Sequence, residues 1–143
     1  MVKRAGSRRK SEGWQVRPRW RITRAGQIAL GPGKAELLEA IERTRAISRG
    51  AVELGMSYRR AWLLVAEMND SFRATLVETS RWRGEGASLT PLGRRALRLY
   101  RLMEARSLTA ARGPIGELQA MLRERSGRSP GRARAGRRVR TSD

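Results

Sequence analysis

The chain has 143 residues, and its 32 Lys+Arg against 13 Asp+Glu give a formal net charge of +19. A chain of this length predicts one domain, and a charge of this sign indicates a polyanionic partner, for which nucleic acid fits better than an anionic membrane surface. The sequence holds no cysteine and no histidine, which excludes disulfides, thiolate nucleophiles, imidazole chemistry and the usual Cys/His zinc sites.

The basic residues are concentrated at the two ends of the chain. Residues 1–21 hold eight basic residues and one acid, and residues 126–143 hold six arginines and one acid. Both ends are poor in apolar residues, so neither buries enough surface to offset the entropy of ordering. We therefore expect a disordered basic arm at 1–17, one domain at 18–124, and a disordered Arg-rich tail at 125–143. A polybasic segment beside such a domain adds phosphate contacts.

The domain opens with two short strands and a helix. The stretch RWRI (19–22) and the stretch QIAL (27–30) predict the strands, with TRAG as the turn between them. A helix follows from about Lys34 to Thr44, because apolar residues recur at helical spacing in Leu37, Leu38 and Ile41.

Two further helices are predicted on either side of a short turn. The stretch ISRGAVEL (47–54) predicts a short helix that Ser48 caps and Gly55 ends. Ser57 then caps a third helix that runs to about Ser71. Its inward stripe is Ala61, Leu64, Val65, Met68 and Phe72.

A ribbon and a long helix complete the domain. TLVETS and SLT predict two strands around the loop RWRGEGA (81–87). Thr90 and Pro91 predict the start of a helix that reaches about Ala111, where Gly113–Pro114 interrupts the pattern before a last amphipathic stretch, 115–124. Along one side the long helix carries Leu92, Ala96, Leu99, Tyr100 and Met103.

This order of elements predicts a mainly α fold with a small β component, a winged helix-turn-helix with a long C-terminal helix. Gly55 tolerates a positive φ at the turn between the second and third helices, which lets the chain bend sharply. In such modules the N-terminal turn of the third helix enters the major groove. We therefore expect double-stranded DNA to be contacted by Ser57, Tyr58, Arg59 and Arg60.

The remaining contacts are expected to be with the DNA backbone. Phosphate neutralisation is predicted for Lys34 and Arg49, and the N–H groups at the start of the second helix, at Ser48, point at a phosphate. In the wing, Arg81, Trp82 and Arg83 lie along the phosphates or the minor groove, and the alternative for Trp82 is to fold back onto the strands. Trp62 is expected in the core rather than at the contact.

The motifs GPGKAELLEAI, AISRGAVELG, MSYRRAWLLVAEMN, LVET and LTPLG resemble the N-terminal DNA-binding domain of ModE-type molybdate-responsive transcription regulators, which carries a LysR-like winged helix-turn-helix. The resemblance covers about residues 18–110. It implies a dimeric prokaryotic regulator in which the helix at 91–111 packs on its copy. The five residues along one side of that helix, named above, are then the dimerisation residues.

Three departures from the family accompany the resemblance. The full-length family adds C-terminal molybdate-binding domains, for which the residues after 124 leave no room, so we expect no molybdate binding in this chain. The wing has only Gly84 and Gly86 where the family has a glycine run. The family's GSIS at the entrance to the second helix is RAIS here, which places Arg45 as an extra phosphate contact.

Two other classes of protein also fit parts of the sequence. A sequence-independent nucleoid or RNA-binding protein needs only the arginine-rich ends, and an adaptor would use the apolar face of IGELQAML as a protein contact. An enzyme is not expected, since the thirteen acids are scattered, and neither a cofactor nor a metal site is indicated. No apolar run is long enough to cross a bilayer, and none follows the basic first residues as in a signal peptide, so we expect a cytoplasmic protein at the nucleoid.

Overall fold

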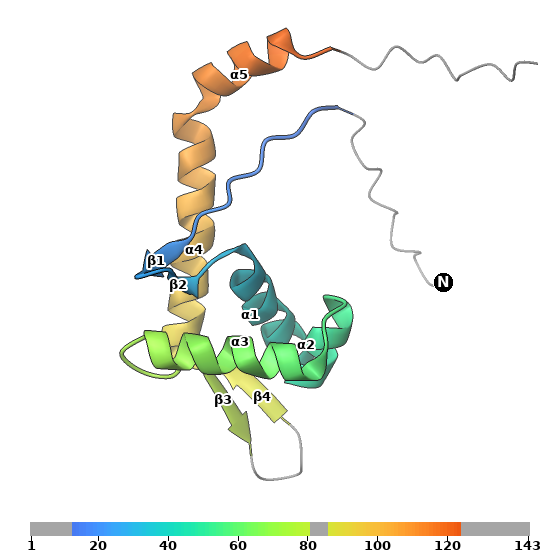
Figure 1. Cartoon of the computed structure of the whole chain (residues 1–143), viewed down its shortest axis with the longest axis vertical. Coiled ribbons are helices and arrows are strands. Elements are labelled where there is room, and N and C mark those ends of the chain that lie inside the picture. Colours follow the sequence, from blue (N-terminus) through green and yellow to red (C-terminus); the bar gives the residue numbers. More distant parts are fainter. Residues whose placement is uncertain (1–12, 81–85, 124–143) are drawn as a thin grey trace, which may run out of the picture.

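The computed structural model describes residues 13–80 and 86–123. In this part of the chain, helices dominate and two antiparallel hairpins accompany them (Figure 1). In chain order the elements are β1 (Ile22–Arg24), β2 (Gln27–Leu30), α1 (Pro32–Thr44), α2 (Ile47–Glu53), α3 (Tyr58–Ser71), β3 (Val77–Ser80), β4 (Gly86–Leu89), α4 (Pro91–Ala110) and α5 (Arg112–Met121). The predicted fold class, mainly α with a small β component in a winged helix-turn-helix order, is confirmed.

The N-terminal hairpin lies three residues further along the chain than predicted at its first strand. Strand β1 is Ile22–Arg24 rather than 19–22, and it pairs antiparallel with β2 through Arg24 opposite Gln27. The turn is therefore the two residues Ala25 and Gly26, both at positive φ. Two-residue turns of this kind match the twist of the strands they join, which is why the shorter turn replaces the predicted TRAG.

The core forms where α1, α2 and α3 meet the wing. The central helix α1 buries Leu37, Leu38 and Ile41 completely, and α3 adds Ala61, Val65 and Met68. Leu64 and Phe72 pack at the edge of the same cluster, so the predicted inward stripe of α3 is confirmed. At about 25 cal/mol per Å² of apolar surface, this burial is the main stabilising term of the domain.

Two local features shape the helix-turn-helix. Gly55 has φ 65° at the end of α2, and Ser57 caps α3 by accepting a hydrogen bond from the Arg60 amide at 3.1 Å. Both were predicted. The predicted cap of α2 is wrong: Ala46 occupies the N-cap, no side chain bonds to the free amides, and Ser48 lies one residue inside the helix.

The wing is fixed to α3 and α4 by polar contacts. Asn69 of α3 accepts hydrogen bonds from the Leu76 and Val77 amides at 2.9 and 3.1 Å and donates to the Val77 carbonyl at 3.1 Å. Thr90 caps α4 by accepting from the Gly93 amide at 3.0 Å and donates to Thr75, as its predicted cap role requires. A Cβ on Gly93 would lie 2.2 Å from the Leu76 carbonyl oxygen, so only glycine lets α4 start this close to β3.

The helix α4 forms a long arm that leaves the body, with α5 at its far end (Figure 1). It ends at Ala110 and α5 begins at Arg112, so the break falls at Ala111, before the predicted Gly113–Pro114, and Pro114 lies in the first turn of α5. Proline is tolerated there because the first-turn N–H groups have no partner within the helix.

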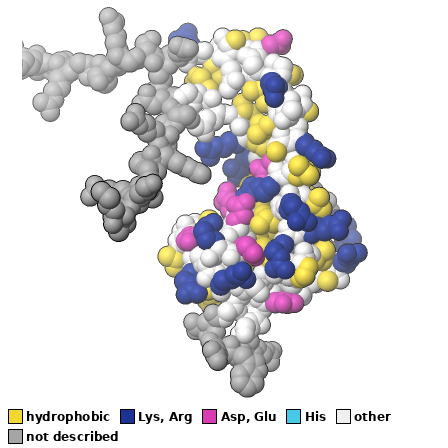
Figure 2. Space-filling view, turned by 180° about the vertical axis from the view of Figure 1, so that it is seen from behind, with side chains coloured by type: hydrophobic (Ala, Val, Ile, Leu, Met, Phe, Trp, Pro, Cys, Tyr) yellow, Lys and Arg dark blue, Asp and Glu magenta, His cyan; other side chains and the backbone are white. Residues whose placement is uncertain are grey.

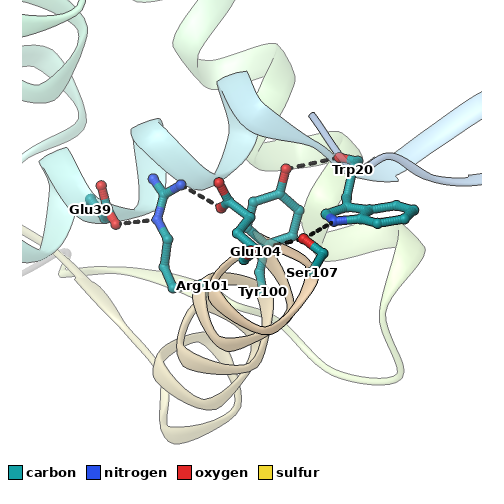
Figure 3. Close-up of polar contacts among 6 residues, drawn as sticks. All are labelled: Trp20, Glu39, Tyr100, Arg101, Glu104 and Ser107. Carbon is teal, nitrogen blue, oxygen red and sulfur yellow. Dashed lines mark hydrogen bonds and ion pairs between the residues drawn. The ribbon is translucent and has the colours of Figure 1, made fainter. Parts of the chain in front are cut away.

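The segment before β1 runs along this arm. The Trp14 indole donates to the Arg123 carbonyl at 2.9 Å, and the Trp20 indole donates to the Ser107 hydroxyl at 3.1 Å. The Tyr100 hydroxyl donates to the Trp20 carbonyl at 2.8 Å (Figure 3). Residues 13–17, which the sequence assigns to the basic arm, are thus part of the described structure, and the two described ends of the chain meet beside α5.

Candidate nucleic-acid interface

The first turn of α3 is exposed. Tyr58 has 55% of its surface exposed, and Arg59 and Arg60 are also exposed. Successive helix residues are about 100° apart, so with Ala61 and Val65 turned to the core, Arg59 points almost directly outward. Tyr58 and Arg60 lie on opposite flanks of α3.

The two flanks of α3 face different hairpins. On one flank, Tyr58 and Trp62 meet edge to face at 6.1 Å between ring centroids and line a pocket of about 450 Å³ with the end of β3 and the start of β4. On the other flank, Arg60 lines a groove shared with the β1–β2 hairpin. Figure 1 shows α3 running between the two hairpins, with β1–β2 above it and β3–β4 below.

The expectation that Trp62 lies in the core is wrong. Its surface is 39% exposed, because it sits one position after the buried Ala61 and points toward the wing. The pocket beside it also contains Ser48. The start of α2, the first turns of α3, the end of β3 and the start of β4 therefore converge on one surface.

The start of α2 contributes two exposed polar residues to this surface. Ser48 and Arg49 are both exposed, and no described residue forms an ion pair with Arg49. Their predicted phosphate contacts stay predictions.

Arg45 lies at the junction of α1 and α2, next to the wing. Its backbone is left-handed, with φ 58° and ψ 24°, and its amide donates to the Ile41 carbonyl at 2.8 Å to close α1. Its carbonyl accepts from the Ala87 amide of β4 at 2.9 Å. The side chain is exposed over a hollow of about 320 Å³ that strands β3 and β4 also line, with Glu78 among the lining residues. The predicted phosphate contact of Arg45 stays a prediction.

Lys34 does not lie on this surface, and its predicted phosphate contact is wrong. Only 6% of it is exposed, and its ammonium group pairs with the Glu67 carboxylate at 3.0 Å and donates to the Ile28 carbonyl. The stretch KAELLEAI placed Lys34 at the start of a helix, but the tertiary fold brings α3 and β2 against it. Lys34 ties three elements together, and two of its three N–H donors already have partners within the domain.

Some site residues lie outside the described part of the chain, and others were missed. Arg81, Trp82 and Arg83 fall in the segment between β3 and β4 that the structure does not describe. Sequence reasoning missed Arg19 and Arg21, which line the groove beside Arg60. Their alternation with Trp20 predicts that both arginines lie on the same side of the segment, but it does not predict which element that side faces.

The residues predicted for dimerisation divide between two environments. Tyr100 is 2% exposed and bonded to Trp20, so the prediction that it faces a partner chain is wrong. Leu92, Ala96 and Met103 are half-buried at the edge of the core, whereas Leu99 is 51% exposed. Figure 2 shows hydrophobic side chains along the arm of α4 and α5 from behind, above a body where Lys and Arg gather.

Arg101 of α4 is neutralised within the chain. Arg101 bonds to Glu39 at 2.5 Å and to Glu104 at 2.7 Å (Figure 3). The hydrogen bond to Glu39 and, after it, the one to Glu104 raise the pKa of the Arg101 guanidinium above its usual value. Arg59 and Arg60, by contrast, make no ion pair with any described residue, so their charges remain available to an external anion.

Within residues 13–80 and 86–123, no helix is both long and apolar enough to cross a membrane. Nor do His, Cys, Asp or Glu side chains gather there in groups of three that could hold a metal ion.

Comparisons with known proteins show similarity to ModE regulators and to molybdenum-pterin-binding proteins. No family model matches the sequence. The chain is 36% identical over 96 residues to the molybdenum-pterin-binding protein MopA of Rhodobacter capsulatus, which covers 66% of this chain and 36% of that protein. It is 40% identical over 74 residues to the DNA-binding transcriptional dual regulator ModE of Escherichia coli K12, and 38% identical over 78 residues to the molybdenum transport protein ModE of Azotobacter vinelandii.

Those two alignments cover 50% and 53% of this chain, and 28% and 29% of the relatives. The chain thus spans about a third of the length of the curated relatives it matches. The fold supports the same assignment, because the turn at Gly55, the cap at Ser57 and the Thr90–Gly93 contact explain the motifs that carry the resemblance. The resemblance to ModE-type proteins is therefore confirmed over 50–66% of this chain, and the described residues have a winged helix-turn-helix order of elements.

Proposed function

We propose that this protein is a transcriptional regulator that binds double-stranded DNA sequence-specifically, with α3 in the major groove. The observation that carries the proposal is the exposed first turn of the capped helix α3, where Arg59 and Arg60 have no ion-pair partner among the described residues. The relatives named as transcriptional regulators support it.

The proposed contacts divide into base readout and backbone positioning. Arg59 points outward from α3, where a bidentate contact to a guanine edge is worth roughly 1–3 kcal/mol against a wrong base. Tyr58 and Ser57 lie beside it on the same turn. Ser48, Arg49 and Arg45 face the backbone from the α2 side, and the wing residues Arg81, Trp82 and Arg83 extend these contacts.

We also propose that the protein is a homodimer joined by α4. Leu92, Ala96, Leu99 and Met103 follow one another along one flank of the helix at spacings of three and four residues. The exposed Leu99 is the centre of that flank. A two-fold dimer places its two α3 helices about one DNA turn apart, roughly 34 Å, which implies a site with two-fold symmetry.

The dimer is tested with Leu99→Glu, which places a charge in the proposed contact. We expect light scattering to report a monomer, since a buried unpaired charge is costly. Leu108→Glu is the matched control, because Leu108 is also exposed but lies on the opposite face of α4 from Leu99. A dimer that survives Leu99→Glu, or dissociates equally in both variants, contradicts this interface.

The proposed function is tested by selection from a random duplex library at about 200 mM salt, where binding through phosphates alone is weak. We expect an enriched motif with two-fold symmetry, and we expect Arg59→Ala to relax one position of it. Recovery of unenriched DNA would refute sequence-specific regulation.

Sequence-independent binding to DNA or RNA is the second candidate. The observation that favours it is the eight basic residues of 1–21 and the six arginines of 126–143. Deleting residues 126–143 should lower affinity for all sequences alike and flatten the salt dependence. A truncated protein that loses only its preferred site would show that the tail reads sequence.

A further inference from the structure

The recognition helix α3 has a second hairpin beside it in addition to the wing. Strand β2 packs on α3, and the flank of α3 that holds Arg60, Leu64 and Glu67 faces the β1–β2 hairpin. The wing occupies the opposite flank, beside Tyr58 and Trp62. A helix in the major groove has a sugar-phosphate strand on each side, since that groove is about 12 Å wide. Each flank of α3 therefore faces one strand.

The groove between α3 and the hairpin carries excess positive charge. It has a volume of about 480 Å³ and is lined by Arg19 and Arg21 from the segment entering β1 and by Arg60 from α3. All three side chains are exposed, and none forms an ion pair with a described residue. Among the described lining residues the one carboxylate is Glu67, and it is already paired with Lys34 at 3.0 Å.

The two arginines before β1 are held in place by the residue between them. The Trp20 carbonyl accepts from the Tyr100 hydroxyl at 2.8 Å, and the Trp20 indole donates to Ser107 at 3.1 Å (Figure 3). This double attachment to α4 fixes the backbone of Arg19 and Arg21 relative to the domain. Arginines fixed in this way lose less entropy on binding an anion than arginines on a free strand would.

We propose that Arg19, Arg21 and Arg60 bind backbone phosphates of the DNA strand on the side of α3 opposite the wing, so that two hairpins hold the duplex from both sides. The proposal rests on the proposed function, because it takes α3 to lie in the major groove. Guanidinium groups match phosphate oxygens in a planar, bidentate geometry, and phosphodiester is the ligand chemistry that three unpaired arginines in an open groove fit.

The test compares two variants with the same change in charge. Arg19→Ala/Arg21→Ala removes two groove arginines, and Arg17→Ala/Arg24→Ala removes two exposed arginines that bracket them but do not line the groove. Each phosphate contact adds about 0.9 to the slope of log K against log salt. We expect the groove pair to lower that slope by roughly 2 and the bracketing pair to lower it by less than 1. Equal slopes in the two variants would overturn the proposal.

Further readouts separate this proposal from its alternatives. Ethylation interference on the selected duplex should lose a phosphate cluster on one strand beside each half-site in the groove variant, while the preferred sequence stays the same. Inorganic phosphate at constant ionic strength should leave the melting temperature of every variant unchanged. If phosphate stabilises only proteins with an intact groove, and the slopes are equal, the groove binds a free anion and the proposal is wrong.

Failure of the groove and failure of the proposed function give different results. If the groove proposal fails, library selection still yields a motif and the two variants share one slope. If the proposed function fails, selection yields no motif, whatever the slopes. Circular dichroism and melting temperature of the variants confirm that each is folded before binding is measured.

Discussion

Both junctions of the helix-turn-helix place one residue in the left-handed region of backbone space. They differ in the type of that residue and in whether a side chain caps the next helix. Between α2 and α3, the left-handed residue is Gly55 at φ 65°, and the helix that follows is capped by Ser57. Between α1 and α2, the left-handed residue is Arg45 at φ 58°, and the N-cap is Ala46, which has no side-chain acceptor. The α2–α3 junction has the residue types that favour this geometry, and the α1–α2 junction does not.

The α1–α2 junction therefore carries residues that local stability alone does not favour. A non-glycine residue in the left-handed region costs roughly 1–2 kcal/mol, and a missing N-cap side chain costs about 1 kcal/mol. The junction also bonds to the wing, through the Arg45 carbonyl and the Ala87 amide. An exposed guanidinium beside the wing is what the sequence gains at this position. The resemblance points the same way, because the family has Gly and Ser where Arg45 and Ala46 stand.

The largest effect on stability is expected from restoring the favoured residues. Arg45→Gly/Ala46→Ser should raise the free energy of unfolding by roughly 2 kcal/mol, as glycine relieves the left-handed strain and serine caps α2. Urea denaturation measures the change. A double variant no more stable than the parent would show that Arg45 and Ala46 cost the fold no stability.

Arg45→Gly should weaken DNA binding although it stabilises the fold. One lost phosphate contact lowers the salt slope by about 0.9. Arg43→Ala is the control, since Arg43 is two residues away and already paired with Glu53. The Glu53 hydrogen bond raises the pKa of Arg43, which reflects this pairing. Equal losses of affinity in both variants would mean that only net charge matters.

The α2–α3 junction should respond in the opposite direction. Gly55→Ala and Ser57→Ala should each lower the free energy of unfolding by about 1 kcal/mol, because alanine fits neither the positive φ nor the cap. Thermal unfolding of both single variants measures this. If Gly55→Ala costs no stability, then a side chain is tolerated at this φ, and the cost assigned to Arg45 is wrong as well.

Tyr100 provides a control away from both junctions. Burial raises the pKa of Tyr100, so at high pH the unfolded chain releases this proton before the folded protein does. The resulting contribution to stability is complete below the ordinary tyrosine pKa of about 10 and is lost as pH rises above it. Tyr100→Phe should remove that part of the pH dependence and about 1 kcal/mol for the bond to Trp20. The junction variants should keep the pH dependence of the parent, as measured by urea denaturation at pH 8 and above 10.

Local features of the sequence by themselves determined most of the fold. The cap at Ser57, the turn at Gly55 and the Thr90–Pro91 start of α4 depend on neighbours within four residues, so the chain order contains all the information they need. The apolar stripe of α3 follows from helical spacing alone. The same spacing placed Arg59 and Arg60 on the exposed surface.

Only the tertiary structure decided what surrounds each side chain. Lys34 was predicted to contact phosphate, but it pairs with Glu67, which is 33 residues away in the sequence. Tyr100 was predicted at a dimer contact, but its hydroxyl bonds to Trp20. Arg19 and Arg21 line the proposed phosphate groove only because folding brings them beside Arg60. Each of these outcomes depends on a partner distant in the sequence. Whether a side chain is buried, paired or free is set by such partners and not by the residue type alone.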